Sequence, residues 1–270
     1  MRRLNDMDAY GMLGKVRQTK PLIHHITNWV TIYDCANMTR VFGALPVMAH
    51  AREEVEEMTG IAGALVLNIG TLTPELVDTM IVAAKAANKR KIPVVFDAVG
   101  TGATRLRTDS AMKILAEARV DVLKGNYGEI GVLAGAKAQV KGVESAGLEG
   151  DPQQVALRLS SQLKNTVAMT GRTDIVSGNG TTYLIDNGSP MMGCIVGTGC
   201  MAASIIGCFC AVEEDYALAS AAALACYGIA GEIASTRAEG PGTFKEAFYD
   251  AAYGLNRSEI ESMLKVRKLR

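Results

Sequence analysis

The sequence has few aromatic residues, few histidines and no excess of charge of either sign. Among its 270 residues, aromatic side chains make up 5%, there are three histidines, and 28 Lys and Arg balance 28 Asp and Glu. Proteins whose main task is to hold nucleic acid need a basic surface, and those that hold single strands also use aromatic side chains for base stacking. We therefore expect no nucleic-acid partner.

Long apolar runs and a regular cysteine pattern are also missing. The most apolar stretch, Met201–Val212, has about 12 residues, whereas a membrane-spanning helix needs about 20. The first 20 residues mix charges throughout and lack the apolar centre of a signal peptide. The six cysteines are too scattered for a disulfide scaffold. We expect a cytoplasmic protein with reduced thiols and no membrane partner.

Short apolar runs alternate with longer stretches rich in Ala, Leu, Glu and Lys. This spacing predicts a mainly parallel sheet with helices on both faces, and no linker divides the chain, so we expect one α/β domain over residues 1–270. The predicted strands are Leu22–Thr27, Pro46–Ala49, Ala64–Ile69, Val94–Asp97, Val120–Leu123 and Val167–Thr170. The predicted helices are Asp6–Gln18, Tyr33–Phe42, Arg52–Thr59, Pro74–Asn88, Asp109–Ala118, Gly128–Leu133 and Pro152–Leu163.

The pattern changes after Asp174. Asp174–Ser177 and Thr181–Ile185 flank a Gly-Asn-Gly turn, which predicts a hairpin. Lys137–Gly150 is rich in glycine and has no strong period, so we expect a long loop. The last part is predicted to be helical, over Gly199–Val212, Tyr216–Arg237 and Thr243–Tyr253.

The strongest local signal is the turn Gly197-Thr198-Gly199-Cys200, which precedes the apolar helix. A glycine-rich turn that opens a helix presents backbone N–H groups at the positive end of the helix dipole, where anions such as a transferring phosphate bind. A plain turn that allows close helix packing is the alternative. The turn is not a Walker loop, because it has no lysine and the sequence has no Gly-Lys-Ser/Thr.

Cys200 lies at the start of that helix. There the dipole would lower the pKa of the thiol and make it a better base or nucleophile, whereas a buried apolar role is what cysteine usually has. We assign that buried role to Cys208, Cys210 and Cys226, which lie on apolar helices.

Polar residues follow two neighbouring strands. Asp97 ends one strand before a glycine-rich loop, where it either helps to hold Mg²⁺ beside phosphates or caps a turn. Asn126 and Glu129 lie at the next strand–helix junction, as further oxygen ligands or as a reciprocal capping box. Lys124, at the same junction, either meets a nucleotide phosphate or is a solvated charge.

His24 and His25 are adjacent in a predicted strand, so their side chains point to opposite faces and do not form a metal pair. We expect both to be structural hydrogen-bonding groups. The sequence shows no Ser-His-Asp order typical of a hydrolase and no Gly-x-Gly-x-x-Gly after its first strand, which disfavours NAD binding.

Taken together, these motifs resemble those of the hydroxyethylthiazole kinases, thiamin-salvage enzymes with the ribokinase-like fold. The resemblance extends from Pro21 to about Phe244, and the eight motifs occur in the family's order. They are Ile26-Thr27-Asn28, Pro46-Val47-Met48-Ala49, Leu67-Asn68-Ile69-Gly70-Thr71-Leu72, Asp97 with Val99-Gly100-x-Gly102-Ala103-Thr104, Gly125-Asn126-x-x-Glu129-Ile130, Thr170-Gly171, Gly197-x-Gly199-Cys200 and Gly240-Pro241-Gly242-Thr243-Phe244. Cys200 stands where most ribokinase-like proteins have Asp, and the thiazole kinases share the cysteine.

The resemblance implies a three-layer α/β/α fold and ATP-dependent phosphorylation of 4-methyl-5-(2-hydroxyethyl)thiazole. It also implies a homotrimer with substrate sites at the subunit interfaces. Contacts to the thiazole alcohol are implied for Asn28, Met48 and Gly197, and contacts to ATP for Lys124, Thr170 and Asn126. Asp97 and Glu129 would organise Mg²⁺, and Thr198, Gly199 and Cys200 would form the catalytic turn, with Cys200 placed to deprotonate the hydroxyl.

Three positions depart from the family pattern. The family usually has Arg at the position of Lys124, so a planar fork is replaced by a point charge, and ATP would bind differently. Ala98 replaces the usual Pro, and Val196 stands where a relative carries a hydroxyl residue. Two other functions remain open on the same scaffold: an ATP-dependent NAD(P)H-hydrate dehydratase, disfavoured by Cys200, and a non-catalytic binder, disfavoured by Asp97 and Glu129.

Overall fold

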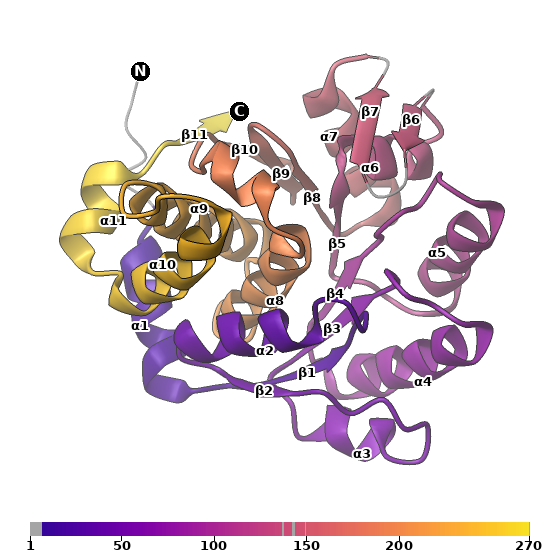
Figure 1. Cartoon of the computed structure of the whole chain (residues 1–270). Helices are drawn as coiled ribbons and strands as arrows, with labels where there is room; N and C mark the ends of the chain where they lie inside the picture. Colours follow the sequence, from indigo (N-terminus) through magenta and orange to yellow (C-terminus); the bar gives the residue numbers. More distant parts are fainter. Residues whose placement is uncertain (1–6, 137, 142–143, 149, 270) are drawn as a thin grey trace.

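The computed structural model describes residues 7–136, 138–141, 144–148 and 150–269 (Figure 1). Its main sheet has nine strands in the order β11-β10-β9-β8-β5-β4-β3-β1-β2. The strands from β2 to β8 in this order are parallel, and β9, β10 and β11 are antiparallel to their neighbours. The strands are β1 Leu22–Ile26, β2 Leu45–Val47, β3 Ala64–Asn68, β4 Val94–Asp97, β5 Val122–Asn126, β8 Thr166–Thr170, β9 Asp174–Gly178, β10 Thr181–Ile185 and β11 Val266–Leu269.

Helices cover both faces of the sheet, which confirms the predicted three layers (Figure 1). One face carries α1 Ala9–Thr19, α2 Ile32–Val41, α8 Thr198–Cys210, α9 Tyr216–Ser235, α10 Pro241–Gly254 and α11 Arg257–Met263. The other face carries α3 Val55–Gly60, α4 Pro74–Arg90, α5 Arg105–Glu117, α6 Tyr127–Leu133 and α7 Pro152–Leu163. A short 3₁₀ helix, η1 Pro190–Cys194, precedes α8.

The central strands are buried on both faces, as their apolar runs predict. Val95 packs into the core beneath α8, whereas its neighbours Val94 and Phe96 pack into the core beneath α4. Alternate side chains therefore fill opposite cores, and a polar residue in such a strand must find a partner within the sheet.

Two apolar helices, α8 and α9, form the centre of the first core. Helix α9 has the length and mean hydropathy of a membrane span, but 83% of its most apolar window is buried inside the molecule. Burial of this kind is typical of a core helix. It arises here because the small side chains of the alanines let α8 and α10 pack closely on α9.

The predicted strands and helices are all present, with differences at their ends. Strand β5 lies further toward the C-terminus than the predicted Val120–Leu123 and ends at Asn126, so Lys124 lies inside the sheet rather than after it. Helix α5 begins at Arg105, because Thr104 caps its first turn. Of the helix predicted over Asp6–Gln18, Asp6 lies outside the described residues, and Asp8 caps α1.

Two regions were predicted incorrectly. Lys137–Gly150 is not one long loop, because β6 Ala138–Lys141 and β7 Glu144–Leu148 pair as an antiparallel hairpin. The sequence pattern also failed to predict α11 and β11, where the strand Val266–Leu269 is short, carries two charges and is held by its pairing with β10. The predicted hairpin of β9 and β10 is confirmed, with Asn179 and Gly180 both at positive φ in the turn.

Close packing of α8 on the sheet predicts that Gly207→Val destabilises the protein. A Cβ atom at Gly207 would lie 2.6 Å from Cγ2 of Val66, inside a core that has no room for it. Overpacking of this kind costs about 1–3 kcal/mol of unfolding free energy, measurable by urea denaturation. Gly14→Ala is the control, because a Cβ there meets nothing within 4 Å. This substitution should not destabilise the protein, since alanine has a higher helix propensity than glycine. Equal stability of the two variants would contradict the packing argument.

Candidate active site

Three polar side chains stand side by side at the carboxyl ends of β3, β4 and β5. Strand register pairs Asn68 with Asp97, and Asp97 with Lys124. The Lys124 ammonium donates to Oδ1 of Asp97 at 3.0 Å, and the Asn68 amide Nδ2 donates to Oδ2 of Asp97 at 2.8 Å. We call these three residues the polar row.

The ion pair of the polar row is fully enclosed. Asp97 is 0% exposed and Lys124 is 4% exposed, so neither the turn-capping role of Asp97 nor a solvated Lys124 is correct. Burial raises the pKa of Asp97, although the charge of Lys124 and the hydrogen bonds from Lys124 and Asn68 act to lower it. Burial also acts to lower the pKa of Lys124, but the charges of Asp97 and Glu129 outweigh it and raise that pKa. Lys124 therefore stays positive, which keeps a cation beneath the site.

Asn68 links the ion pair to two residues predicted to bind substrate or catalyse. Oδ1 of Asn68 accepts from Nδ2 of Asn28 at 2.9 Å. Nδ2 of Asn28 also donates to Sγ of Cys200 at 3.3 Å. Because Asn68 Nδ2 donates to a carboxylate, the orientation of both amides is fixed. Asn68 belongs to one of the sequence motifs but had no predicted role; the available signal was a polar residue that ends an otherwise apolar strand.

The predicted turn needs glycine at Gly197, and its helix start has no side-chain cap. Gly197 has φ +96°, and a Cβ there would lie 2.6 Å from Thr31, so only glycine fits. No side chain caps the start of α8. A Cβ at Gly199 would lie 3.2 Å from the Lys124 ammonium. The backbone N–H groups of the turn and the positive charge of Lys124 thus converge on one place.

The lowered thiol pKa predicted for Cys200 is wrong. Burial and then the charge of Asp97 raise the pKa of its thiol, whereas the helix start had predicted a lowered pKa. The dipole of one helix is outweighed because the sulfur is removed from water and lies near a buried carboxylate. Cys208, Cys210 and Cys226 are buried with raised thiol pKa values, as predicted for apolar roles.

Asn126 and Glu129 form the predicted capping box at the start of α6. Oδ1 of Asn126 accepts from the Glu129 N–H at 2.9 Å, and Oε2 of Glu129 accepts from the Asn126 N–H at 2.6 Å. Oε1 of Glu129 also accepts from the Gly100 N–H at 2.7 Å, which ties α6 to the loop after β4. Burial raises the pKa of Glu129 to about 7.

The two carboxylates predicted to organise Mg²⁺ are already engaged. All four of their oxygens accept hydrogen bonds, and among the described residues no cluster of three or more His, Cys, Asp and Glu could hold a metal. Each carboxylate oxygen keeps a second lone pair. Asp97 and Glu129 therefore fit as acceptors for water around a Mg²⁺ held mainly by phosphates, and not as a preformed metal cage.

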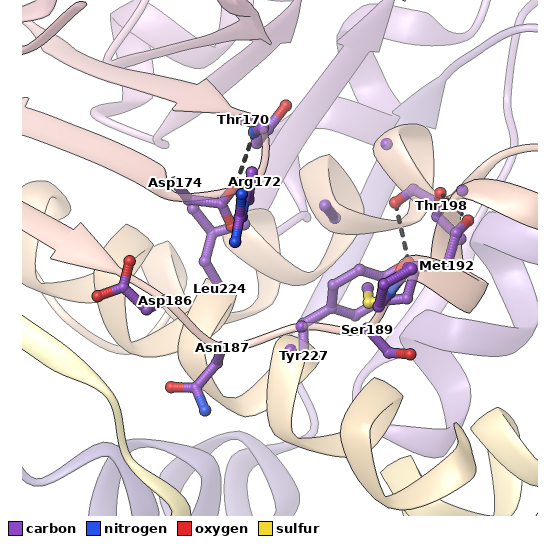
Figure 2. A pocket seen from close by; sticks show the side chains of 17 residues that line it. Thr170, Arg172, Asp174, Asp186, Asn187, Ser189, Met192, Thr198, Leu224 and Tyr227 are labelled. Carbon is purple, nitrogen blue, oxygen red and sulfur yellow. Dashed lines mark hydrogen bonds between the residues drawn. The ribbon is translucent and has the colours of Figure 1, made fainter. Parts of the chain in front are cut away.

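A cavity of about 740 Å³ lies beside the turn, over the ends of β8, β9 and β10 (Figure 2). Of the predicted site residues, Thr170, Thr198 and Gly199 line it. The Tyr227 hydroxyl, from α9, donates to the Thr198 carbonyl at 2.8 Å, and the Thr198 hydroxyl donates to the Met192 carbonyl at 3.0 Å. Burial raises the pKa of Asp174, another lining residue, to about 7. Sequence reasoning missed Tyr227 and Asp174 as cavity residues because they come from elements far apart in the chain.

Met48 lies outside the lining of that cavity. It is partly buried at the end of β2, and its carbonyl faces His50 Nδ1 at 3.2 Å. The His50 ring lies 4.7 Å from that of Trp29, the neighbour of Asn28, so the two predicted substrate loops are adjacent.

The two adjacent histidines are buried hydrogen-bonding groups, as predicted. His24 contacts Thr59 and Ala49, and His25 contacts Ile23 and Ser204. Their partners lie in different parts of the core, so the pair plays no joint role at the site.

Removal of the cation from the polar row should destabilise the fold. We expect Lys124→Met to cost about 3–5 kcal/mol of unfolding free energy, because it leaves Asp97 buried and unpaired. An unpaired Asp97 would take up a proton on folding, so the loss should grow as the pH rises from 5 to 8. Urea denaturation at several pH values measures this.

The exposed pair of Lys113 with Asp78 provides the control, and Lys113→Met should change stability far less at every pH. A loss in Lys124→Met as small as in this control would contradict the argument.

Comparisons with known proteins show the family and the fold of this chain. The model of the hydroxyethylthiazole kinase family matches residues 13–258. A hydroxyethylthiazole kinase of Methanosarcina mazei is 56% identical over 257 residues, which cover 95% of this chain and 98% of the relative. The solved hydroxyethylthiazole kinase of Pyrococcus horikoshii superposes with a TM-score of 0.90 at 40% identity, covering 97% and 99% of the two chains. A ribokinase-like protein of Enterococcus faecalis, at 14% identity, 93% and 90% coverage and a TM-score of 0.59, shares the fold. The polar row, the glycine turn and the cavity thus lie in a chain that belongs to the hydroxyethylthiazole kinase family.

Proposed function

We propose that this protein transfers the γ-phosphoryl group of ATP to the hydroxyl of 4-methyl-5-(2-hydroxyethyl)thiazole, as a step of thiamin salvage. The observation that carries the proposal is the convergence of the glycine turn, the Lys124 ammonium and the Cys200 thiol at the edge of a cavity large enough for a nucleotide. Phosphoryl transfer requires mainly positioning and stabilisation of charge on the phosphate oxygens, which these groups supply.

The nucleotide occupies the cavity in this proposal, beside the lining residue Thr170, with its phosphates directed to the start of α8. The N–H groups of Thr198 and Gly199 then face the transferring phosphoryl group, with Lys124 beneath them. Lys124 is enclosed, so its point charge acts across Gly199 and a planar Arg fork is not required there. Asn126 contributes mainly by fixing the junction of β5 and α6 through its capping box.

The thiazole alcohol lies on the other side of Cys200, against Asn28, Met48 and Gly197. Asn28 is held by Asn68 and by Thr31, whose N–H and hydroxyl both donate to Oδ1 of Asn28 at 3.0 Å. This leaves the amide of Asn28 rigid beside the sulfur. A rigid contact orients the hydroxyl for in-line attack without further loss of entropy.

Mg²⁺ accompanies ATP in the proposed reaction and would neutralise charge on the β- and γ-phosphates. Asp97 and Glu129 would accept hydrogen bonds from its waters.

We also propose a cytoplasmic homotrimer of single-domain subunits with the thiazole sites at the interfaces. Exposed apolar side chains flank the substrate residues: Trp29, Val30 and Tyr33 follow Asn28, and Val196 precedes Gly197. Their exposed fractions of 57% to 74% favour a covered interface over open solvent.

A single assay tests the function. The protein is incubated with ATP, Mg²⁺ and the thiazole alcohol, and the phosphate ester and ADP are measured. We expect the two products in equal amounts. NAD(P)H hydrate replaces the alcohol in a parallel reaction. Ester formation supports the kinase, restored NAD(P)H would indicate the dehydratase, and no product in either reaction would leave only a binding role.

Cys200 should set the pH dependence of turnover. Cys200→Ala should lower kcat by about 10²–10⁴-fold if the thiolate accepts the hydroxyl proton. Because the thiol pKa is raised, the thiolate fraction and kcat of the native enzyme should increase from pH 6 to 9. Cys200→Asp should remain active, and its kcat should reach a plateau at a lower pH than that of the native enzyme, because a carboxyl group ionises at a lower pH than a thiol. Steady-state rates of the three forms test this; an Ala variant equal to native at every pH would assign Cys200 to packing.

Gly199 should tolerate no side chain. Gly199→Val should lower kcat by about 10²–10³-fold, because its Cβ would crowd the Lys124 ammonium and fill the place of the phosphate. Gly242→Ala is the control, since a Cβ there meets nothing within 4 Å. Both variants are checked by thermal melting. A folded Gly199→Val with native kcat would show that the turn is only structural.

A further inference from the structure

One wall of the cavity is a single loop. Residues 186–190, with Met192 and Gly193 after them, line it between the end of β10 and the start of α8. Such a wall can hold a ligand in one position only if its backbone is fixed from behind. The side chain that lies behind this loop is Asn187, which is 6% exposed.

The Asn187 amide is fully engaged on the side away from the cavity. Its Nδ2 donates to Oε1 of Glu232 at 3.0 Å and to the Met263 carbonyl at 2.9 Å, and its Oδ1 accepts from the Lys265 N–H at 2.9 Å. In Figure 2 the amide points away from Thr170 and Thr198, toward the C-terminal ribbon.

The loop packs against helix α9 at two glycines. A Cβ at Gly228 would lie 2.6 Å from the Asn187 carbonyl oxygen, and a Cβ at Gly231 would lie 2.6 Å from Sδ of Met192. The loop therefore packs directly on the backbone of α9. Oε1 of Glu232, one residue further, also accepts from the Gly188 N–H at 2.9 Å.

The C-terminal segment supplies the rest of the anchor. β11 pairs with β10 up to Ile185, and the Asp186 N–H donates to the Lys265 carbonyl at 2.9 Å. The Lys265 ammonium donates to Oε2 of Glu232 at 2.8 Å, and Arg267 pairs with the lining residue Asp186 at 2.8 Å. This segment lies beyond residue 258, where the match to the family model ends.

We propose that Asn187 is a positioning residue for the nucleotide, acting through the backbone of the loop 186–193, and that the segment from Met263 to Leu269 is its anchor. The inference rests on the proposed function, because it takes the cavity as the ATP site. Asn187 touches the ligand site with its backbone, while its side chain holds that backbone against α9 and β11. Loss of the anchor therefore weakens ATP binding and leaves unchanged the proposed thiazole contacts of Asn28 and Met48, which follow β1 and β2.

Asn187→Asp tests this with almost no change of shape. An aspartate keeps the acceptor for the Lys265 N–H but replaces both amide donors with an oxygen that faces the Glu232 carboxylate and the Met263 carbonyl. We expect KM for ATP to rise at least about tenfold, with KM for the thiazole alcohol and the thiol-dependent pH profile unchanged. Calorimetry with ATP alone should show the same loss of affinity without turnover.

A second substitution provides the rescue. When Asn187→Asp is combined with Glu232→Gln, the new glutamine amide can donate to the carboxylate introduced at position 187. The local net charge also returns to its native value, but the glutamine nitrogen that donates to position 187 cannot accept from the Gly188 N–H, so part of the ATP affinity should return. Asn179→Asp is the matched control, the same chemical change in the exposed turn at the far end of the β9–β10 hairpin. It should behave as native.

The outcomes separate the two proposals. If the native protein neither binds ATP nor forms the ester, the proposed function fails. If it does both and Asn187→Asp keeps native KM for ATP, or raises both KM values and lowers kcat together, the positioning role is wrong. A loss of ATP affinity that the double variant does not recover even in part would also overturn the link to Glu232.

Discussion

The ion pair between Lys124 and Asp97 is the interaction on which the site depends. Both groups lie in central strands that are buried on each face, where an uncompensated charge is not tolerated. The pair forms only when β4 and β5 keep the register that places these residues opposite each other. A slip of either strand by one residue would turn its side chain to the other face of the sheet, away from its partner. The ion pair thus specifies the register, and the register places Asn68 against Asp97.

The same ion pair accounts for the state of the thiol. Asn68 and Asn28 connect Asp97 to Cys200, and the charge of Asp97 joins burial in raising the thiol pKa. A carboxylate in place of Cys200 would add a second negative charge beside Asp97. A thiol is neutral at rest, so it adds no further negative charge beside Asp97. This difference gives a physical reason for a cysteine, and not an acid, at this position.

The two sides of the site are stabilised in different ways. The proposed thiazole side is built on the parallel strands and their polar row, and the proposed nucleotide side on the antiparallel edge, where a loop packs on the glycines of α9 and is held by β11. The sequence singled out residues of the first side, because glycines and polar residues at the ends of apolar strands are strong local signals. It missed the second, because the Asn187 contacts join residues 45 to 78 positions apart and no local pattern marks them. The hairpin of β6 and β7 was missed for a related reason, since its strands carry no apolar alternation.

The sequence by itself determined the alternation of strands and helices, the apolar core strands, the glycine turn before α8 and the capping box of Asn126 and Glu129. Each of these follows from interactions between residues close in the chain: side-chain period, backbone conformation and local hydrogen bonds. Only the tertiary structure decided that Lys124 is enclosed, that Asn68 belongs to the site and that the thiol pKa is raised. Those properties depend on the distance between charges from different strands and on the removal of water around them. Local sequence patterns predict neither quantity.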